Sequence, residues 1–414
     1  MTATGFLRAG HWPTLLAAFL YFDVSFMVWV MLGPLGPYLT ESMGLSASQK
    51  GLLIATPLLA GSLIRPLLGA LADRIGGRRT GMMGLFLTLA PLVYGWQFAR
   101  SLPEFFVVAA MLGIAGASFA VALPLASRWY PPEYQGLAMG IAGAGNSGTV
   151  LATLFAPRLA ASLGWANVFG LALVPVVAVA LLFAVIAKDA PGERKQTQWK
   201  DYRELLAESD TKWFCFFYSI TFGGFVGLAS FLTVFFFDQY HLTKVQAGDF
   251  ATIAVICGSF LRPVGGLFAD RIGGYRMLVA VLLLSAASML GLATLPGAFT
   301  ALGLFAFTMA MFGMGNGAVF QLVPQRFGGQ VGLITGLVGA AGGLGGFFLP
   351  SIFGILRDRT GSYAAGLSVF ACLILLGFGA LLTLGTVWMK QWPEAMVQRA
   401  GLFSVRGSLT EEAE

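Results

Sequence analysis

Residues 64–79 read IRPLLGALADRIGGRR, and residues 261–276 read LRPVGGLFADRIGGYR. The two copies keep one offset, because Arg65 and Arg262 are 197 residues apart and the aspartates that follow them have the same separation. Such a match indicates a duplicated chain. Each half is therefore expected to carry an arginine and a polar, glycine-containing loop at equivalent positions.

The segments around these repeats are long and apolar. Hydrophobic residues make up 57% of the 414 residues and charged residues only 11%, whereas a soluble protein has roughly 25% charged residues. A membrane-spanning helix needs about 20 mostly apolar residues. Twelve such stretches are present, at residues 14–39, 49–72, 79–98, 102–128, 135–162, 164–187, 211–238, 245–270, 275–296, 299–324, 330–355 and 363–389. The sequence predicts an all-α membrane protein with twelve transmembrane helices.

A polar stretch follows the sixth predicted helix and divides the chain. It predicts an N-terminal six-helix bundle at 1–187, a cytoplasmic linker at 188–210, a C-terminal six-helix bundle at 211–390 and a cytoplasmic tail at 391–414. Halves repeated with the same topology are typical of parallel-repeat transporters, whose substrate site lies between the halves near the membrane midplane. Two pseudo-symmetric bundles that rock about such a site are therefore expected.

The net charge of +6 does not indicate nucleic-acid binding, because the basic residues sort by side of the membrane. They are concentrated in the segments that share a side with both termini. By the positive-inside rule, both termini are expected in the cytoplasm. The two histidines and three cysteines show no metal-ligand spacing, so no metal and no cofactor is expected.

Three ionisable residues lie well inside the predicted helices, namely Asp23, Arg65 and Arg262. An arginine at a helix centre costs about 2.5 to 3.5 kcal/mol on insertion scales, which suggests a function. The repeat should bring the two arginines to the interface from opposite sides, and guanidinium groups match planar oxyanions in a bidentate way. The sequence thus predicts a clamp for one anion, and the alternative is that each arginine pairs with a helix-end carbonyl or local acid.

The paired loops after the second and eighth predicted helices resemble the signature loop of the major facilitator superfamily, and the resemblance covers essentially the whole chain. It implies the two-bundle fold but not the substrate. Residues Asp73, Arg74, Asp270 and Arg271 occupy these loops. The aspartates are expected to brace the cytoplasmic gate through charge contacts with neighbouring helix ends.

Two glycine-rich segments, 140–148 and 336–346, resemble the paired nitrate signatures of the nitrate/nitrite porter family, and the run AGAGNSG at 142–148 is the most specific match. The formal GxGxxG inside it has no preceding strand and does not indicate a dinucleotide site. Small residues instead let helices approach closely, and the glycines expected beside the substrate are Gly143, Gly145, Gly339 and Gly342.

The same resemblance implies roles for individual side chains. Asn146 would face the substrate as a hydrogen-bond donor, or form an interhelical bond without a ligand, and Gly342 at the equivalent position makes any such contact one-sided. Phe26 and Phe119 would sandwich the anion, while Tyr218 donates its hydroxyl. Aromatic ring edges carry the positive part of the quadrupole and suit a weakly hydrated anion.

Two coupling modes follow from these residues. Two permanent positive charges make an empty carrier slow to reorient, which favours nitrate/nitrite exchange. Asp23 could instead carry a proton, which favours nitrate/proton symport, or it could pair locally at the cytoplasmic edge. Symport is slightly favoured, because the compact chain resembles the shorter, assimilatory members at least as much as the exchangers.

The expected protein is a monomeric secondary transporter of nitrate or nitrite in the bacterial inner membrane, with the lipid bilayer as its surroundings. An organic phosphate or a small carboxylate is the alternative substrate, since either could also use two arginines. A receptor would need a soluble signalling domain that neither terminus offers. An enzyme would need a nucleophile and base or a metal site, and the sequence provides neither.

Overall fold

The computed structural model describes residues 3–191, 199–327 and 331–402, and those residues form helices without any strand. Parts of the predicted linker and tail, at 192–198 and 403–414, lie outside the described residues. The helices are α1 (Ala3–Ala9), α2 (Trp12–Val30), α3 (Leu32–Met43), α4 (Ala47–Ile75), α5 (Gly77–Gln97), α6 (Leu102–Gly116), α7 (Phe119–Ser127), α8 (Pro132–Gly143), the 3₁₀ helix η1 (Ala144–Ser147), α9 (Gly148–Leu163), α10 (Trp165–Ile186), α11 (Trp199–Ala207), α12 (Ser209–Tyr240), α13 (Lys244–Ile272), α14 (Gly274–Ala293), α15 (Ala298–Arg326), α16 (Val331–Thr360), α17 (Ala364–Gln391) and α18 (Glu394–Ala400).

The predicted membrane spans are found as helices. Within the described residues, eleven helical segments are long and apolar enough to cross a membrane. The twelfth predicted span, 79–98, is α5, which falls below that measure because Arg78 and Arg79 open it and Gln97 ends it. With α5, the segments correspond to the twelve predicted, and the chain is a multi-pass membrane protein.

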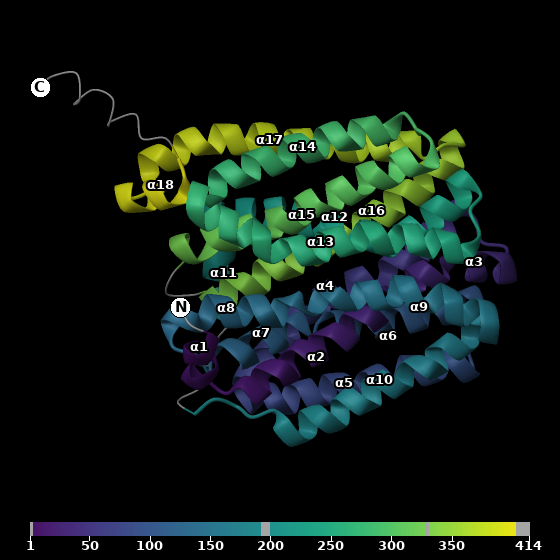
Figure 1. Cartoon of the computed structure of the whole chain (residues 1–414), viewed down its shortest axis with the longest axis horizontal. Helices are drawn as coiled ribbons and strands as arrows, with labels where there is room; N and C mark the ends of the chain where they lie inside the picture. The colour runs from purple at the N-terminus through teal and green to yellow at the C-terminus, as the bar shows by residue number, and fades with distance from the viewer. Residues whose placement is uncertain (1–2, 192–198, 328–330, 403–414) are drawn as a thin grey trace, which may run out of the picture.

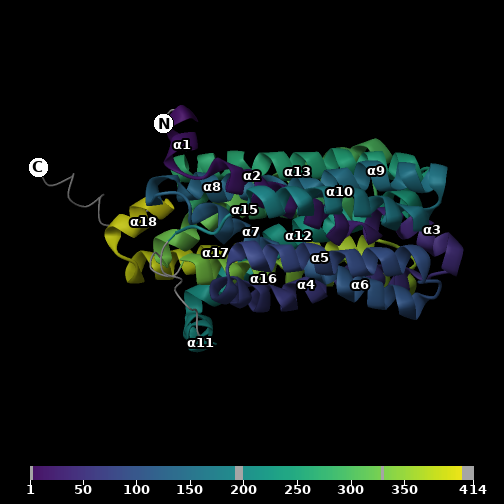
Figure 2. The same cartoon turned by 90° about the horizontal axis from the view of Figure 1, so that it is seen from below.

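The helices separate into two groups of consecutive elements. Figure 1 shows α2–α10, in purple to teal, below α12–α18, in green to yellow, with both ends of the chain at the left. Figure 2, seen from below, has the helices of the two groups overlapping, with α11 projecting near the end that bears the chain termini. The groups meet where α4 packs on α16, α3 on α12 and α9 on α13.

Three spans in the first half are interrupted, whereas their counterparts in the second half are continuous. The first span changes from α2 to α3 at Met31, the fourth from α6 to α7 at Ala117 and Ser118, and the fifth passes through η1. By contrast, α12, α15 and α16 each run unbroken. Helix ends leave carbonyl groups without their usual partners, so the interrupted spans of the first half offer such groups near the middle of the bundle.

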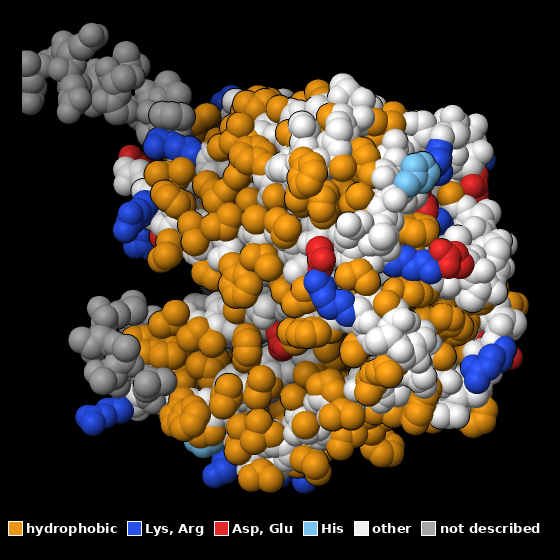
Figure 3. All heavy atoms as spheres, turned by 45° about the vertical axis from the view of Figure 1, so that its right-hand side comes forward, with side chains coloured by type: hydrophobic (Ala, Val, Ile, Leu, Met, Phe, Trp, Pro, Cys, Tyr) orange, Lys and Arg blue, Asp and Glu red, His pale blue; other side chains and the backbone are white. Residues whose placement is uncertain are grey.

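The end opposite the chain termini is closed by contacts between the halves. Ion pairs join Lys50 to Asp238 at 2.6 Å, Arg158 to Asp249 at 2.5 Å, and Lys244 to Glu41. Backbones also meet there, since a Cβ added at Gly33 would lie 1.9 Å from the Ser230 carbonyl oxygen. Figure 3 shows an opening between the halves at the end that bears the grey tail, while atoms of both halves touch at the other end.

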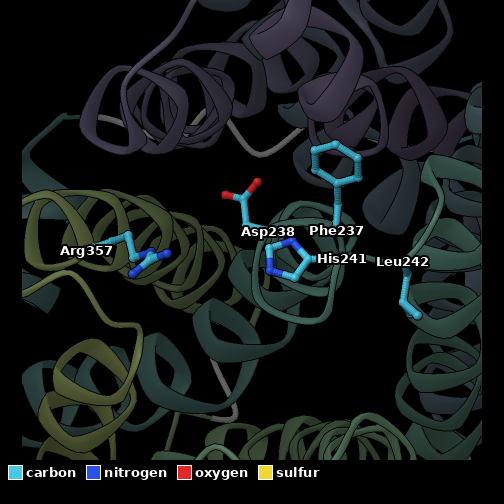
Figure 4. Close-up of a pocket in the computed structure, with 5 residues that line it drawn as sticks. All are labelled: Phe237, Asp238, His241, Leu242 and Arg357. Carbon is cyan, nitrogen blue, oxygen red and sulfur yellow. The ribbon is translucent and has the colours of Figure 1, made fainter.

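A surface pocket of about 360 Å³ lies beside this closed end. Figure 4 shows its lining, in which Phe237 and Asp238 come from the end of α12, His241 and Leu242 follow that helix, and Arg357 comes from α16. The Asp238 carboxylate also accepts a hydrogen bond of 2.7 Å from the Tyr363 hydroxyl. Asp238 on α12 thus contacts Lys50 of the first half and Tyr363, the residue that precedes α17, in the second half.

Candidate substrate site

Arg65 lies on α4 with 1% of its surface exposed. Its Nε donates to the Gly116 carbonyl at 3.0 Å, and its Nη1 donates to the Gly339 carbonyl of the other half. The first acceptor is available because α6 ends at Gly116. Nη2 has no hydrogen-bond partner among the described residues, so one edge of the guanidinium retains a free donor.

Aromatic rings surround this guanidinium. Its central carbon lies 5.0 Å from the centroid of Trp29, 5.4 Å from that of Phe119 and 5.5 Å from that of Phe222. Cation–π contacts of this kind are worth about 2 kcal/mol or more when they are desolvated. They therefore offset part of the cost of burying the charge of Arg65 in the membrane.

Arg262 lies on α13, at the equivalent point of the second half. Its Nη2 donates to the Tyr218 hydroxyl at 3.3 Å, and its central carbon lies 5.9 Å from the centroid of Phe320. Its Nη1 is buried and has no partner among the described residues. The two arginines are close enough to repel each other. The structure thus brings Tyr218, which the family resemblance implies, into contact with Arg262, which the repeat relates to Arg65.

The two rings predicted to sandwich the anion, Phe26 and Phe119, both pack on Phe22. The ring centroid of Phe26 lies 4.4 Å from that of Phe22 and 4.9 Å from that of Trp29. The centroids of Phe119 and Phe22 are 5.6 Å apart. Phe26 also lies 6.2 Å from Phe222 of the second half. Both predicted rings therefore belong to one aromatic cluster that spans the interface, with Phe22 between them.

The glycines of α16 approach the site closely. A Cβ at Gly339 would lie 2.9 Å from the Phe119 ring, and a Cβ at Gly342 would lie 2.5 Å from the Tyr218 ring. In the first half, a Cβ at Gly145 would lie 2.8 Å from the Phe19 carbonyl oxygen, whereas Gly143 has nothing within 4 Å. Gly339 and Gly342 thus lie at the site of the arginines, beside Phe119 and Tyr218. Gly145 allows α2 to pack closely against η1, and Gly143 makes no close contact of either kind.

Asn146 lies within η1 and is 1% exposed, and neither atom of its side-chain amide has a partner among the described residues. The interhelical hydrogen bond considered as the alternative is therefore not formed in this conformation. The next residue, Ser147, donates to the Asp23 carboxylate at 2.7 Å. Asp23 consequently anchors the 3₁₀ segment that carries Asn146.

The residues expected to form the gating loops lie at the end that bears the chain termini, and their contacts differ between the two halves. Asp73 forms a 2.5 Å ion pair with Arg128, which caps α7. The offset of 197 places Gln325 at the position of Arg128, and Asp270 has no ion-pair partner in the described part of the chain. Arg74 and Arg271 are exposed. The charge contact expected of both aspartates is thus present for Asp73 alone.

The linker helix α11 also reaches this end, through Tyr202. Burial, and then the charge of Asp73, raise the pKa of the Tyr202 hydroxyl. The phenol therefore stays protonated at neutral pH.

Three aromatic residues of the site were missed by the sequence reasoning, namely Trp29, Phe222 and Phe320. Phe222 stacks on Tyr218 at 5.0 Å and lies one helical turn from it, so the i, i+4 rule could have found it. Trp29 follows Phe26 by three residues in the same way. Phe320, 5.0 Å from the Tyr218 ring, is one of 36 phenylalanines and carries no comparable signal.

Comparisons with known proteins agree with this architecture. The family model described as Major Facilitator Superfamily matches residues 15–350. Solved structures with a similar fold include a D-xylose-proton symporter, with a TM-score of 0.72 and 16% identity over 89% of this chain and 97% of that one. Another is the human organic anion transporter MFSD10, with a TM-score of 0.71 and 17% identity over 90% and 99%. The fold and the matched model define a secondary transporter of the major facilitator superfamily.

Curated relatives narrow the family. The chain is 35% identical over 377 residues to the nitrite extrusion protein of Bacillus subtilis (strain 168), covering 90% of this chain and 92% of that protein. It is 34% identical to the probable nitrate/nitrite antiporter NarK1 of Thermus thermophilus, covering 83% and 84%. Within the superfamily, the chain belongs to the nitrate/nitrite porter family, and it is a transporter rather than an enzyme.

Proposed function

We propose that this protein transports nitrate or nitrite by alternating access, with the anion held between Arg65 and Arg262. The observation that carries the proposal is a pair of guanidinium groups from opposite halves, each with a buried nitrogen that lacks a partner among the described residues, Nη2 of Arg65 and Nη1 of Arg262. A buried donor without a partner costs about 1 to 3 kcal/mol, more when it is charged. An anion that accepts from both would remove this cost.

The chemistry of the surroundings favours a small, planar, weakly hydrated anion. The rings of Trp29, Phe119 and Phe222 lie within 5.5 Å of the Arg65 guanidinium carbon, and the Tyr218 hydroxyl is bonded to Arg262. The Cβ-free surface of Gly339 and Gly342 leaves room for the rings. A phosphate ester or carboxylate with an organic substituent would have to displace these rings, so nitrate and nitrite fit better.

The conformation corresponds to one half of a transport cycle. We propose that residues 1–187 and 211–390 act as two rigid bundles, that the end with the termini faces the cytoplasm, and that the membrane is the bacterial inner membrane. The basic residues concentrated at the terminal end support this orientation. The ion pairs at the opposite end would then close the periplasmic side, and the opening between the halves in Figure 3 would face the cytoplasm.

Exchange of nitrate for nitrite and symport of nitrate with a proton use the same clamp. Symport has one specific observation in its favour, the Asp23 carboxylate, 9% exposed within the first span and bonded to the segment that presents Asn146. Counterflow in proteoliposomes separates the modes. Uptake that requires internal anion indicates exchange, and uptake into empty vesicles driven by an inward pH gradient indicates symport and directs attention to Asp23→Asn.

The clamp is tested by Arg65→Lys and Arg262→Lys, which keep the charge and remove the fork. Loss of one hydrogen bond to a charged group, about 1.5 to 3 kcal/mol, should weaken nitrate binding roughly 10- to 150-fold and abolish most counterflow. Arg158→Lys is the matched control, because Arg158 forms only a partly exposed ion pair. Wild-type counterflow in folded Arg65→Lys and Arg262→Lys protein would contradict the clamp.

A further inference from the structure

A second buried asparagine shares the unusual state of Asn146. Asn316 lies on α15 and is 0% exposed, and neither its Oδ1 nor its Nδ2 has a partner among the described residues. Most buried side-chain amides in folded proteins are hydrogen-bonded, and each exception requires an explanation. A primary amide offers two donors and an acceptor. Burying all of them without a hydrogen-bond partner costs folding free energy.

The repeat places Asn316 at a defined point of the site. Its offset from Phe119 is 197 residues, the offset that also relates Arg262 to Arg65. In the first half, the Phe119 ring lies 5.4 Å from the Arg65 guanidinium carbon. The equivalent neighbours in the second half are Asn316 and Arg262, so a polar amide stands where the first half has a ring.

Contacts along α15 support this placement. Gly317 faces α13, because a Cβ there would lie 2.8 Å from the Arg262 carbonyl oxygen. Gly315 faces α12, where a Cβ would lie 2.8 Å from Thr221. Phe320, one turn further along, lies 5.0 Å from Tyr218. Asn316 therefore leaves α15 between α12 and α13, the two helices that carry Tyr218 and Arg262.

We propose that Asn316 is a substrate-binding residue, which donates its amide hydrogens to an oxygen of the bound planar oxyanion. This inference rests on the proposed function and extends it. Asn146 then supplies an amide from the first half, from the fifth span, and Asn316 supplies one from the second half, from the tenth. Between the fifth and eleventh spans, only Asn146 can offer an amide to the anion, because Gly342 stands at the equivalent position. Asn316 on α15 would supply the amide of the second half instead.

The role also gives Asn316 a part in selectivity. Nitrate presents three oxygens and nitrite two, so a donor in addition to the two guanidinium forks and Asn146 is most useful to the ion with the third oxygen. Removal of Asn316 should therefore weaken nitrate binding more than nitrite binding. A residue that only supports packing would change both ions alike.

The test is isothermal titration of purified protein with sodium nitrate and sodium nitrite, together with counterflow. Asn316→Leu should bind nitrate roughly 10- to 100-fold more weakly, with a smaller loss for nitrite and an intact melting profile. Asn316→Asp, which is isosteric, places a carboxylate beside the anion and should weaken both ions further. Ser285→Ala is the control, because Ser285 is also buried without a partner in the same bundle.

The outcomes separate the two proposals. Wild-type protein that neither binds nor exchanges nitrate or nitrite would overturn the proposed function and this inference with it. Wild-type activity together with unchanged nitrate and nitrite affinities in folded Asn316→Leu or Asn316→Asp would overturn this inference alone. If Asn316→Leu melts higher and keeps its affinity, the amide serves a resident water molecule, and the inference is likewise overturned.

Discussion

Replacing Lys50 by methionine removes the cation of the most buried ion pair between the halves. Lys50 Nζ lies 2.6 Å from Asp238 Oδ2, and the two side chains are 6% and 17% exposed. The pair exists only while this end is closed, because its members lie on α4 and α12. After the substitution, Asp238 keeps the Tyr363 hydroxyl as a partner but loses its counter-ion. The substitution therefore raises the free energy of the closed conformation and leaves that of the open conformation unchanged.

The size of the shift follows from the burial. Removal of one member of a buried ion pair costs about 3 to 5 kcal/mol. Asp238 is partly exposed and keeps one hydrogen bond, so a reduced value of about 2 kcal/mol is appropriate. A tenfold change in an equilibrium corresponds to about 1.4 kcal/mol. The ratio of open to closed molecules at this end should therefore rise about 30-fold.

Cysteine labelling measures this ratio. Thr153 is buried where its hydroxyl meets that of Thr252 of the other half at 2.9 Å, so Thr153→Cys is reached only when this end opens. In protein whose Cys215, Cys257 and Cys372 are changed to alanine, the maleimide reaction rate of that cysteine reports the open population. Lys50→Met should raise the rate about 30-fold, and the double variant Lys50→Asp with Asp238→Lys should restore it.

The matched control is Arg158→Gln, which breaks a second pair at the same interface. Its members are 41% and 37% exposed, and exposed pairs contribute about 0 to 1 kcal/mol, so the rate should change less than about fivefold. A rate in Lys50→Met no greater than that of the control would refute the reasoning. The Lys50–Asp238 pair would then not restrain the closed end.

Two further predictions concern stability and packing. Asp210 accepts hydrogen bonds from Arg326 Nε at 2.5 Å, Trp388 Nε1 at 2.8 Å and Trp392 Nε1 at 3.2 Å. Asp210→Ala should therefore lower the stability of the protein by about 3 kcal/mol in thermal unfolding, whereas Glu204→Ala on α11 should leave it unchanged. Equal melting temperatures of the two variants would contradict this prediction. Gly148→Ala should reduce the yield of folded protein in size-exclusion profiles, because the added Cβ would lie 1.9 Å from the Asp23 carbonyl oxygen. Gly140→Ala is the control and should match the wild type, because no atom lies within 4 Å of a Cβ at that position. Similar yields of the two variants would contradict the close approach at Gly148.

The spans and the arginine pair were predictable because each has a strong, redundant signal. Apolar runs of membrane length mark the helices, and the constant offset of 197 residues marks Arg65 and Arg262 as equivalents. The helix breaks at Ala117 and within η1 were not predictable in this way. Both interrupted segments remain apolar and small-residue-rich throughout, so composition does not distinguish a continuous span from one that stops and restarts.

The site was predictable where family motifs cover it and not where packing across the interface decides. Tyr218 was expected from its motif and lies on Arg262. Phe26 and Phe119 were also expected from motifs, and the sandwich about an anion stays a prediction; what the motifs do not indicate is that both rings pack on Phe22. Asn316 has no local motif, and its proposed role rests on the offset of 197 residues from Phe119 together with its burial without partners among the described residues.

The two arginines are equivalent in sequence but not in their bonding, and the difference bears on the transport cycle. Arg65 is bonded to a carbonyl of its own half, Gly116, and to one of the other half, Gly339, whereas Arg262 is bonded to Tyr218 within its own half. An anion that binds the free Nη2 of Arg65 would share the charge of the guanidinium with the Gly339 carbonyl, which accepts from Nη1. We therefore expect a bound anion to weaken the bond between Arg65 and Gly339, which joins the two halves. Under the proposed clamp, this bond would oppose reorientation of the carrier without an anion, and that behaviour is a prediction of the exchange mode rather than of symport.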